Sequence, residues 1–229
     1  MALNIFAVDK SNAEDSEERS SDIVGRFRAG YQVDGRPVGL SEFRFTTPDP
    51  DIGIRVADVL GLAEGDEGVR EWETTTEERW EVFTAASAVD IIVDGPGAIQ
   101  ASFVLWGQNG KILETDGSHL IEDGKVTDEI CTMTHGKTLK EILAAGRAGK
   151  GPGPSLAVYF SLADAPEIGK IRFYSSSGTA IEQFGEEASR LETLEGPQKY
   201  RLELKKVEFE KDGETIRYSK PVLTYLGEA

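Results

Sequence analysis

The sequence predicts an α+β fold built on mainly antiparallel sheets, with hairpins and two or three packed helices. Most apolar residues alternate with polar ones over short runs, as in half-buried strands, and turn-forming residues separate the runs. Only a few stretches have the apolar spacing of a helix. Because hairpin turns rather than helical crossovers join the strands, we expect antiparallel sheets.

The N-terminal residues differ in character from the rest of the chain. Residues 1–22 begin with a short apolar run and continue as the polar, acidic text KSNAEDSEERSSD, so we expect a short strand and a mobile acidic linker. Residues 23–229 are expected to form a single α+β domain. If this domain divides into two subdomains, the break is expected near residues 124–154.

The first predicted hairpin covers residues 23–45. The text VDGR at residues 33–36 is typical of a turn, and Phe43 and Phe45 alternate with charged residues as in a half-buried strand. The prolines of PDPD, residues 48–51, end this strand. A short helix is predicted after them from the spacing of Ile54, Val56, Ala57 and Leu60.

Three antiparallel strands are predicted between Trp80 and Asp116. The segment DGPG, residues 94–97, is expected to turn the chain after the first strand, and Asn109-Gly110 is a strong hairpin dipeptide after the second. The alternating apolar residues of the first two strands are Val89, Ile91, Val93, Ile99, Ala101, Phe103 and Leu105.

Two further strands and a helix are predicted between residues 155 and 196. The two apolar runs within 155–175 are joined by a turn containing Pro166, so we expect them to pair. Thr179 and Glu182 have the spacing of a capping box, and Gly196 is expected to end the helix. The core-facing stripe of this helix is Ile181, Phe184, Ala188, Leu191 and Leu194.

The chain is predicted to close on a hairpin. Tyr200, Leu202 and Leu204 alternate with polar residues, and the alternation changes phase at Lys205-Lys206, where we expect a β-bulge. Asp212-Gly213 is expected to form the turn. The apolar residues after the phase change are Val207, Phe209, Ile216, Tyr218 and Val222.

The charge of the chain restricts its function. It has 25 Lys and Arg residues against 41 Asp and Glu residues, a formal net charge of −16 at pH 7. Duplex-binding proteins gain affinity by neutralising phosphates, and a strongly acidic chain is repelled by them at long range. Direct, unaided DNA binding is therefore disfavoured.

Cysteine use and the N-terminus bear on the compartment. Cys131 is the lone cysteine, which excludes an internal disulfide and suits a reducing cytoplasm. The first residues hold a short apolar run followed by acids, so we expect no signal peptide, and no stretch approaches the roughly 18 apolar residues of a membrane span. We expect a cytoplasmic protein without membrane contact.

A basic segment stands out in this acidic chain: HGKTLKEILAAGRAGKGPGP, residues 135–154. Gly149-Lys150 suggests a phosphate-binding loop, which requires G-x-x-x-x-G-K-[ST] directly after a strand. The motif fails, because Gly151 follows the lysine, Ala144 stands in place of the first glycine, and a helical pattern precedes it.

The same segment predicts a helix with a basic surface. Thr138 and Glu141 have capping-box spacing, and Arg147 lies near the C-terminal end, where a positive charge is favourable. Two interpretations stay open, a solvated helix face and a basic patch that contacts a partner. The candidate partner-binding residues are Lys137, Lys140, Arg147 and Lys150.

Arg26, Phe27 and Arg28 form a second basic island. Basic residues around an aromatic side chain occur in nucleic-acid-binding surfaces. They equally fit charges on a strand edge that guard against aggregation. The island is the second candidate for partner binding.

Metal binding is weighed for His119, Cys131 and His135. The spacing between Cys131 and His135 is tolerable for metal ligands, but a structural zinc needs four donors and the chain offers these three unless a carboxylate joins. We favour no metal, with Cys131 as a small buried residue and the histidines as surface residues.

The sequence indicates no enzyme and no cofactor. It has two histidines, no G-x-S-x-G elbow and no H-E-x-x-H motif, so the usual hydrolase sites lack their parts. The alternative is a nuclease that uses a divalent cation, because two groups of acidic residues could supply oxygen ligands for the ion. These acids are those of PDPD, residues 48–51, and Glu71, Glu73, Glu77, Glu78 and Glu81, the latter group also fitting the polar surroundings of two tryptophans.

Most of the chain from about residue 22 onward resembles the recombination directionality factors that work with large serine integrases in actinobacterial phages. The resemblance lies in the text and order of several segments, not in a catalytic motif. These segments are DIVGRFRAGYQVDGRPVGLSEFRFTT, EWETTTEERWEVFTAASAVDIIVDGPGAI, FVLWGQNGKILETDG, GRAGKGPGPSLAVYFSLADAPEIGKIRFYSSSG and KPVLTYLG.

The resemblance implies a non-enzymatic regulator in the cytoplasm of a bacterial host. Such factors bind the coiled-coil and zinc-domain region of a serine integrase and switch it from attP × attB integration to attL × attR excision. Contact with DNA would then be indirect, through the integrase. The alternative is a phage or prophage structural or DNA-metabolism accessory protein without catalytic activity.

Overall fold

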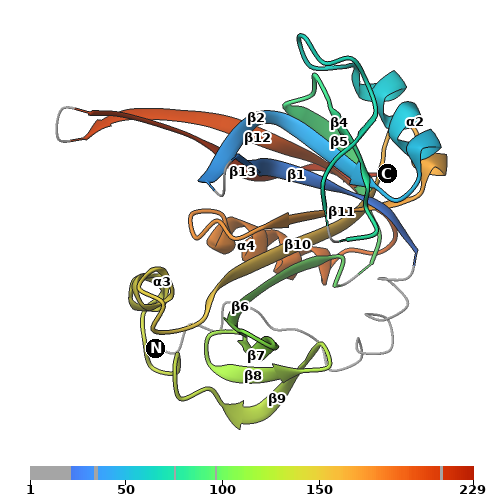
Figure 1. Ribbon diagram of the computed structural model, residues 1–229. Coiled ribbons are helices and arrows are strands. Elements are labelled where there is room, and N and C mark those ends of the chain that lie inside the picture. The colour runs from blue at the N-terminus through green and yellow to red at the C-terminus, as the bar shows by residue number, and fades with distance from the viewer. Residues whose placement is uncertain (1–21, 34–35, 75, 96, 212–213) are drawn as a thin grey trace. The chain divides into compact units, whose positions relative to one another are not determined.

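The computed structural model describes residues 22–33, 36–74, 76–95, 97–211 and 214–229. Within these residues the chain forms three α-helices and 13 strands, most of them paired antiparallel, which confirms the predicted α+β class (Figure 1). The predicted opening strand and acidic linker lie outside the described residues, except for Asp22.

The described chain divides into two compact units. Unit 1 contains Gly95–Val158 and Ser175–Gly196, and unit 2 contains Asp22–Asp94, Tyr159–Tyr174 and Pro197–Ala229. Strand β10 (Gly153–Leu162) contributes its first part to unit 1 and its second part to unit 2. The expected single domain, with a break near 124–154, stays a prediction.

Unit 2 is a sheet with one α-helix. Its strands are hydrogen-bonded in the order β3-β4-β2-β1-β11-β10-β5-β12-β13, and the β1–β11 pair is parallel. The predicted hairpin at 23–45 and the pairing of the strands within 155–175 are confirmed. Besides part of β10, its elements are β1 (Ile23–Val33), β2 (Arg36–Thr47), α2 (Pro50–Leu60), β3 (Arg70–Glu71), β4 (Trp80–Phe83), β5 (Ala88–Val93), the 3-10 helix η1 (Pro166–Ile168), β11 (Lys170–Ser175), β12 (Gln198–Lys211) and β13 (Glu214–Glu228).

A cluster of phenylalanines forms the core of unit 2. The Phe27 ring stacks on Phe43 with 5.1 Å between centroids, and Phe45 and Phe160 approach the same ring. All four side chains are buried. Because alternate residues of a strand point to one face, the F-x-F spacing of β2 places both of its aromatics in this core.

A largely buried network of charges lies on the opposite face of β1 and β2. Arg44 is 4% exposed, donates to Glu81 Oε2 at 2.6 Å, and its guanidinium lies 4.2 Å from the ring centroid of Trp72. Arg28 is paired directly across the sheet with Arg44, a position in which two like charges destabilise the sheet. Acidic partners are therefore needed: Glu81 pairs with Arg44, and Glu78 pairs with Arg28 at 2.7 Å.

We expect Glu81→Gln to lower the free energy of unfolding by about 3 kcal/mol, because removing one partner of a buried ion pair leaves an uncompensated buried charge on Arg44. Urea unfolding measures this change. Glu77→Gln, at an exposed residue nearby, is the control and should change stability by less than about 0.5 kcal/mol. Equal unfolding midpoints for the two variants would contradict the expectation.

Unit 1 is a smaller sheet with two helices. Its strands pair in the order β10-β6-β7-β8-β9, and α4 packs along β6 (Figure 1). The predicted β6–β7 hairpin forms, with its turn at Gln108-Asn109 and with Gly110, the first residue of β7, opposite Gly107. Besides part of β10, its elements are β6 (Ile99–Gly107), β7 (Gly110–Thr115), β8 (His119–Glu122), β9 (Lys125–Ile130), α3 (Leu139–Arg147) and α4 (Ile181–Leu191).

One predicted turn and one predicted helix cap are wrong, and one hairpin was missed. In the described pairings β5 and β6 do not pair with each other; each pairs with a different part of β10, so DGPG interrupts the strand pattern without forming a hairpin. Helix α4 begins after Ala180, which makes no side-chain cap, and Thr179 exchanges a hydrogen bond with Ser177 at 3.0 Å instead. A hairpin of β8 and β9 at Asp123-Gly124 was missed, although both residues have positive φ and the dipeptide is typical of such turns.

The closing hairpin is confirmed, but its predicted bulge is wrong. The pairing of β12 with β13 is continuous from Tyr200 opposite Tyr225 to Lys211 opposite Glu214, with the register shift at Lys199/Tyr200. No bulge occurs at Lys205-Lys206. The apolar positions therefore move to the other face of the hairpin at that point.

Helix α4 buries one acid with its apolar face. Glu187 is 8% exposed beside the buried residues Phe184 and Leu191. Burial raises the pKa of the Glu187 carboxyl, and Arg190, 3.1 Å away, opposes this shift incompletely. Because the folded-state pKa is raised, the ionised carboxylate destabilises the fold above that pKa, and acidification removes this cost.

Glu187→Gln is accordingly expected to raise the midpoint of thermal unfolding at pH 7. The gain should shrink as the pH falls through the folded-state pKa and vanish below the ordinary value of 4.5. Thermal unfolding of both proteins between pH 4 and pH 8 measures it. A difference that is constant with pH, or a variant less stable at pH 7, would show that the carboxylate is well compensated.

Candidate partner-binding surfaces

Helix α3 is fixed in unit 1 by its cap and by one buried face. The Thr138 amide donates to Glu141 Oε2 at 2.8 Å and the Glu141 amide donates to Thr138 Oγ1 at 3.4 Å, so the predicted capping box is confirmed. Hydrogen bonding from Thr138 lowers the pKa of the Glu141 carboxyl. Ile142 is buried, with its Cδ1 near Gly117.

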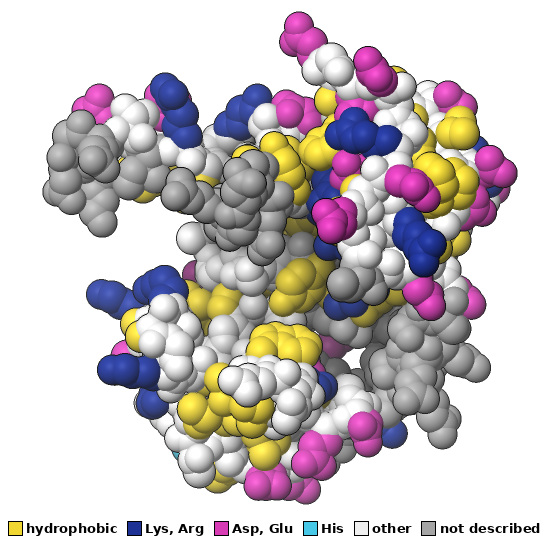
Figure 2. Space-filling model, viewed as in Figure 1, with side chains coloured by type: hydrophobic (Ala, Val, Ile, Leu, Met, Phe, Trp, Pro, Cys, Tyr) yellow, Lys and Arg dark blue, Asp and Glu magenta, His cyan; other side chains and the backbone are white. Residues whose placement is uncertain are grey.

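The basic side chains around this helix are exposed. We call Lys137, Lys140, Arg147 and Lys150 together the basic surface, which Figure 2 shows as dark blue side chains over α3. None of the four forms a side-chain ion pair with another described residue. Glu141, the acid within the helix, is engaged in the cap. The positive charge is therefore available to an external partner.

The Arg26–Arg28 island is placed differently from the basic surface. Phe27 is 1% exposed and belongs to the core of unit 2. Arg26 and Arg28 both contact Glu78, at 2.6 and 2.7 Å, so a single carboxylate compensates much of their charge. Their side chains are 41% and 30% exposed. In the structure both arginines are therefore paired with Glu78 of the same chain. Their binding to a partner stays a prediction.

The candidate metal ligands do not form a site in the described residues. Cys131 is buried, and the His135 amide donates to the Cys131 carbonyl at 2.9 Å within one turn. His119 Nδ1 lies 3.7 Å from Asp116 Oδ2. Across the part of the chain that the structure describes, no three His, Cys, Asp or Glu side chains are grouped as a metal ion requires.

Three of the acids considered for a divalent cation have other roles. Asp49 caps α2 by accepting from the Asp51 amide at 2.9 Å, and Glu78 and Glu81 pair with arginines. A shallow pocket in unit 2 holds Asp90, which Arg201 contacts at 2.7 Å. That contact lowers the pKa of the Asp90 carboxyl. Asp90 and Arg201 in this pocket are therefore paired with each other.

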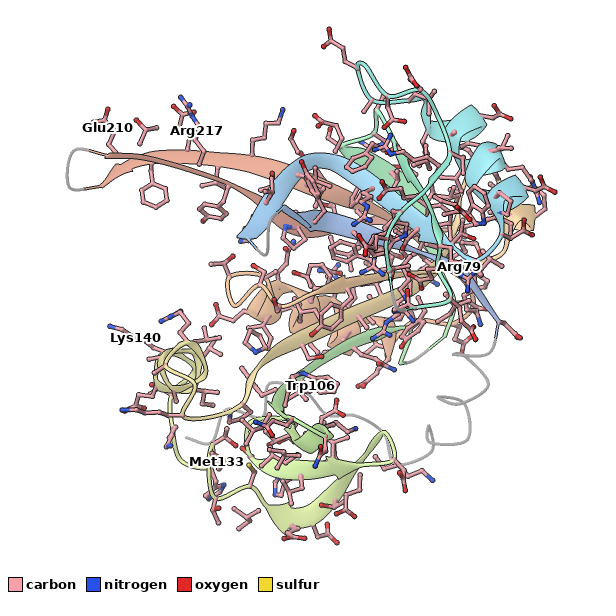
Figure 3. The ribbon with its side chains drawn as sticks, viewed as in Figure 1. Arg79, Trp106, Met133, Lys140, Glu210 and Arg217 are labelled. Atoms are coloured by element: carbon pink, nitrogen blue, oxygen red, sulfur yellow. The ribbon has the colours of Figure 1, made fainter. Side chains whose placement is uncertain are left out.

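Exposed aromatic residues were missed by the sequence analysis. Trp106, at the end of β6, is 62% exposed, and the neighbouring Ile112 is 63% exposed (Figure 3). Phe209 and Tyr218 of the closing hairpin are 43% and 41% exposed. Their exposure could have been predicted from their position near a hairpin turn, because residues at a turn have few neighbours to bury them.

The family model described as Gp3-like, recombination directionality factor-like, matches residues 24–225. The chain belongs to this family. No solved structure was found to match the chain.

Membership in the Gp3-like family supports a role as a recombination directionality factor and an interaction with a recombinase. Families of this kind are typically non-catalytic. The helices of the described residues have at most 11 residues, too few for the roughly 20 of a membrane-spanning helix.

Proposed function

We propose that this protein is a recombination directionality factor that binds a phage serine integrase and switches it from attP × attB integration to attL × attR excision. The single observation that supports this most is the family match across residues 24–225. The contact is between proteins, in the cytoplasm of the bacterial host, and involves the coiled-coil and zinc-domain region of the integrase. DNA is reached only through the integrase.

The charge of the chain supports indirect contact with DNA. A protein with a net charge of −16 is repelled by a duplex, whereas a DNA-bound recombinase is a basic partner that electrostatic attraction brings closer. The factor then adds no phosphate contacts of its own.

Switching direction requires selective binding. A ligand shifts an equilibrium between two arrangements of a protein only by the difference in its affinity for them. Moving a population from about 1:99 to about 99:1 takes a difference of about 5.5 kcal/mol. The factor must therefore contact a part of the integrase whose position differs between the integration and excision complexes, and it needs no strand-cleaving residue.

The basic surface on α3 is the first proposed contact. Its four side chains are exposed, and the capping box and the buried Ile142 hold the helix that carries Lys140 and Arg147. The arginines at 26 and 28 are a weaker candidate because Glu78 contacts both.

A recombination assay with the purified cognate integrase tests the function. With attL and attR substrates, we expect recombinants only when the protein is added, and with attP and attB we expect fewer recombinants than without it. Excision that stays at background at a saturating concentration of the protein would contradict the proposal.

The triple variant Lys140→Glu, Arg147→Glu, Lys150→Glu tests the basic surface. We expect the concentration that gives half-maximal excision to rise at least about tenfold, because attraction at an interface becomes repulsion. The control, Arg55→Glu, Arg79→Glu, Lys111→Glu, makes the same change in net charge at other exposed residues. Circular dichroism checks folding. Full excision by the folded triple variant would exclude this surface.

A further inference from the structure

The closing hairpin changes its buried face along its length. Near its base, Leu202 and Leu204 of β12 and Leu223 of β13 are buried on one face. Further out, the same face carries Lys206 and Glu208, both exposed. Since the register is continuous there, the apolar residues beyond Leu204 lie on the opposite face. They do not extend the core of unit 2.

Among the described residues no third strand pairs with the outer part of the hairpin, and it contacts β2 through Lys206, whose Nζ lies 3.5 Å from Glu42 Oε1. We call 205–211 and 214–220 the distal hairpin (Figure 1). Strand β5 pairs with β12 only as far as Glu203, so among the described residues the distal strands pair only with each other. A two-stranded hairpin has marginal stability in water. Apolar side chains placed on such an element gain little from folding unless another surface covers them.

The distal hairpin has one polar and one aromatic face. Glu208 accepts from Arg217 Nε at 2.8 Å and from its Nη2 at 3.2 Å, and Figure 3 shows Arg217 and Glu210 pointing to the same side. The other side is the aromatic face, formed by Val207, Phe209 and Tyr218. The rings of Phe209 and Tyr218 lie edge to face, with 6.3 Å between centroids.

Lysines flank the aromatic face at its inner end. Lys205 and Lys220 are directly opposite each other in the register, on the same side of the hairpin as Phe209. Like charges in this position are unfavourable for the hairpin itself. In a chain with a net charge of −16, this local concentration of positive charge fits a partner with acidic groups beside an apolar surface.

We propose that the aromatic face binds an amphipathic helix of the recombinase, one whose apolar stripe is flanked by acidic side chains. The inference rests on the proposed function and assigns a second contact surface to it. Neighbouring Cβ atoms on one face of a helix are about 5–6 Å apart, close to the 6.3 Å between the two ring centroids. A nucleic acid is the poorer fit, because a stacking surface for bases is normally lined by a basic groove, and Glu208 and Glu210 lie on the same strand as Phe209.

The test compares variants of the two faces in the full-length protein. Phe209→Ser, Tyr218→Ser removes the aromatic face, and Glu208→Ser, Arg217→Ser changes adjacent positions of the polar face as the matched control. Binding to the purified cognate integrase on an attL duplex is measured by biolayer interferometry. We expect affinity to fall at least about 30-fold for the aromatic variant and to change less than about twofold for the control.

A second variant tests whether weaker binding could come from unfolding of the hairpin instead of loss of the contact. Lys205→Glu, Lys220→Glu keeps the aromatic residues and is expected to weaken binding about tenfold, with thermal unfolding near that of the wild type. Unchanged binding by both the aromatic and the lysine variant, when the wild type binds, would overturn this inference and leave the proposed function intact. No binding by the wild type would overturn both.

Two further results would assign the aromatic face to another occupant and overturn the inference. One is binding of the wild type alone to a labelled oligo-dT strand that the aromatic variant loses, while its integrase binding is unchanged. The other is a concentration-dependent dimer in sedimentation that the aromatic variant abolishes without effect on the integrase.

Discussion

The internal pairing of positive charge determines which surfaces of this protein are left to attract a partner. The arginines of β1 and β2 lie close together on one face of the sheet, and the fold tolerates them because Glu78 and Glu81 are placed between them. Asp90 does the same for Arg201. Several cations within the sheet are paired with acids in this way, whereas the basic surface and the lysines at 205 and 220 form no ion pair with another described residue.

This distribution separates two kinds of contact. A continuous basic face is what a duplex requires, and compensated arginines do not supply one. Small basic or lysine-flanked surfaces on projecting elements are enough for a protein partner, where a few well-placed groups dominate the affinity. The basic surface is polar and the aromatic face is apolar, so the two would contribute different terms: faster association from charge and slower dissociation from burial.

Much of the fold was predictable because its hairpins depend on local turn chemistry. Asn109-Gly110 and the capping box at Thr138 work through residues a few positions apart, and both predictions hold. The failures involve distant partners. Whether β5 pairs with β6 or with β10 depends on residues some 70 positions away, which no turn dipeptide specifies. The change of phase at Lys205-Lys206 was visible, but a bulge and a change of buried face give the same pattern, and only the pairing distinguishes them. For the candidate surfaces the same limit holds: the exposure of Lys140 and Arg147 on α3 followed from its periodicity, whereas the pairing of Arg28 with Glu78, 50 residues away, did not.

Indirect contact with DNA is tested most directly by binding of the protein alone to a labelled attL duplex, followed by fluorescence anisotropy from 50 to 200 mM salt. We expect no binding by the protein at any salt concentration in this range, and a further rise in anisotropy when it is added to the integrase–duplex complex. Tight binding of the isolated protein to the bare duplex, weakening steeply with salt as phosphate contacts require, would contradict it.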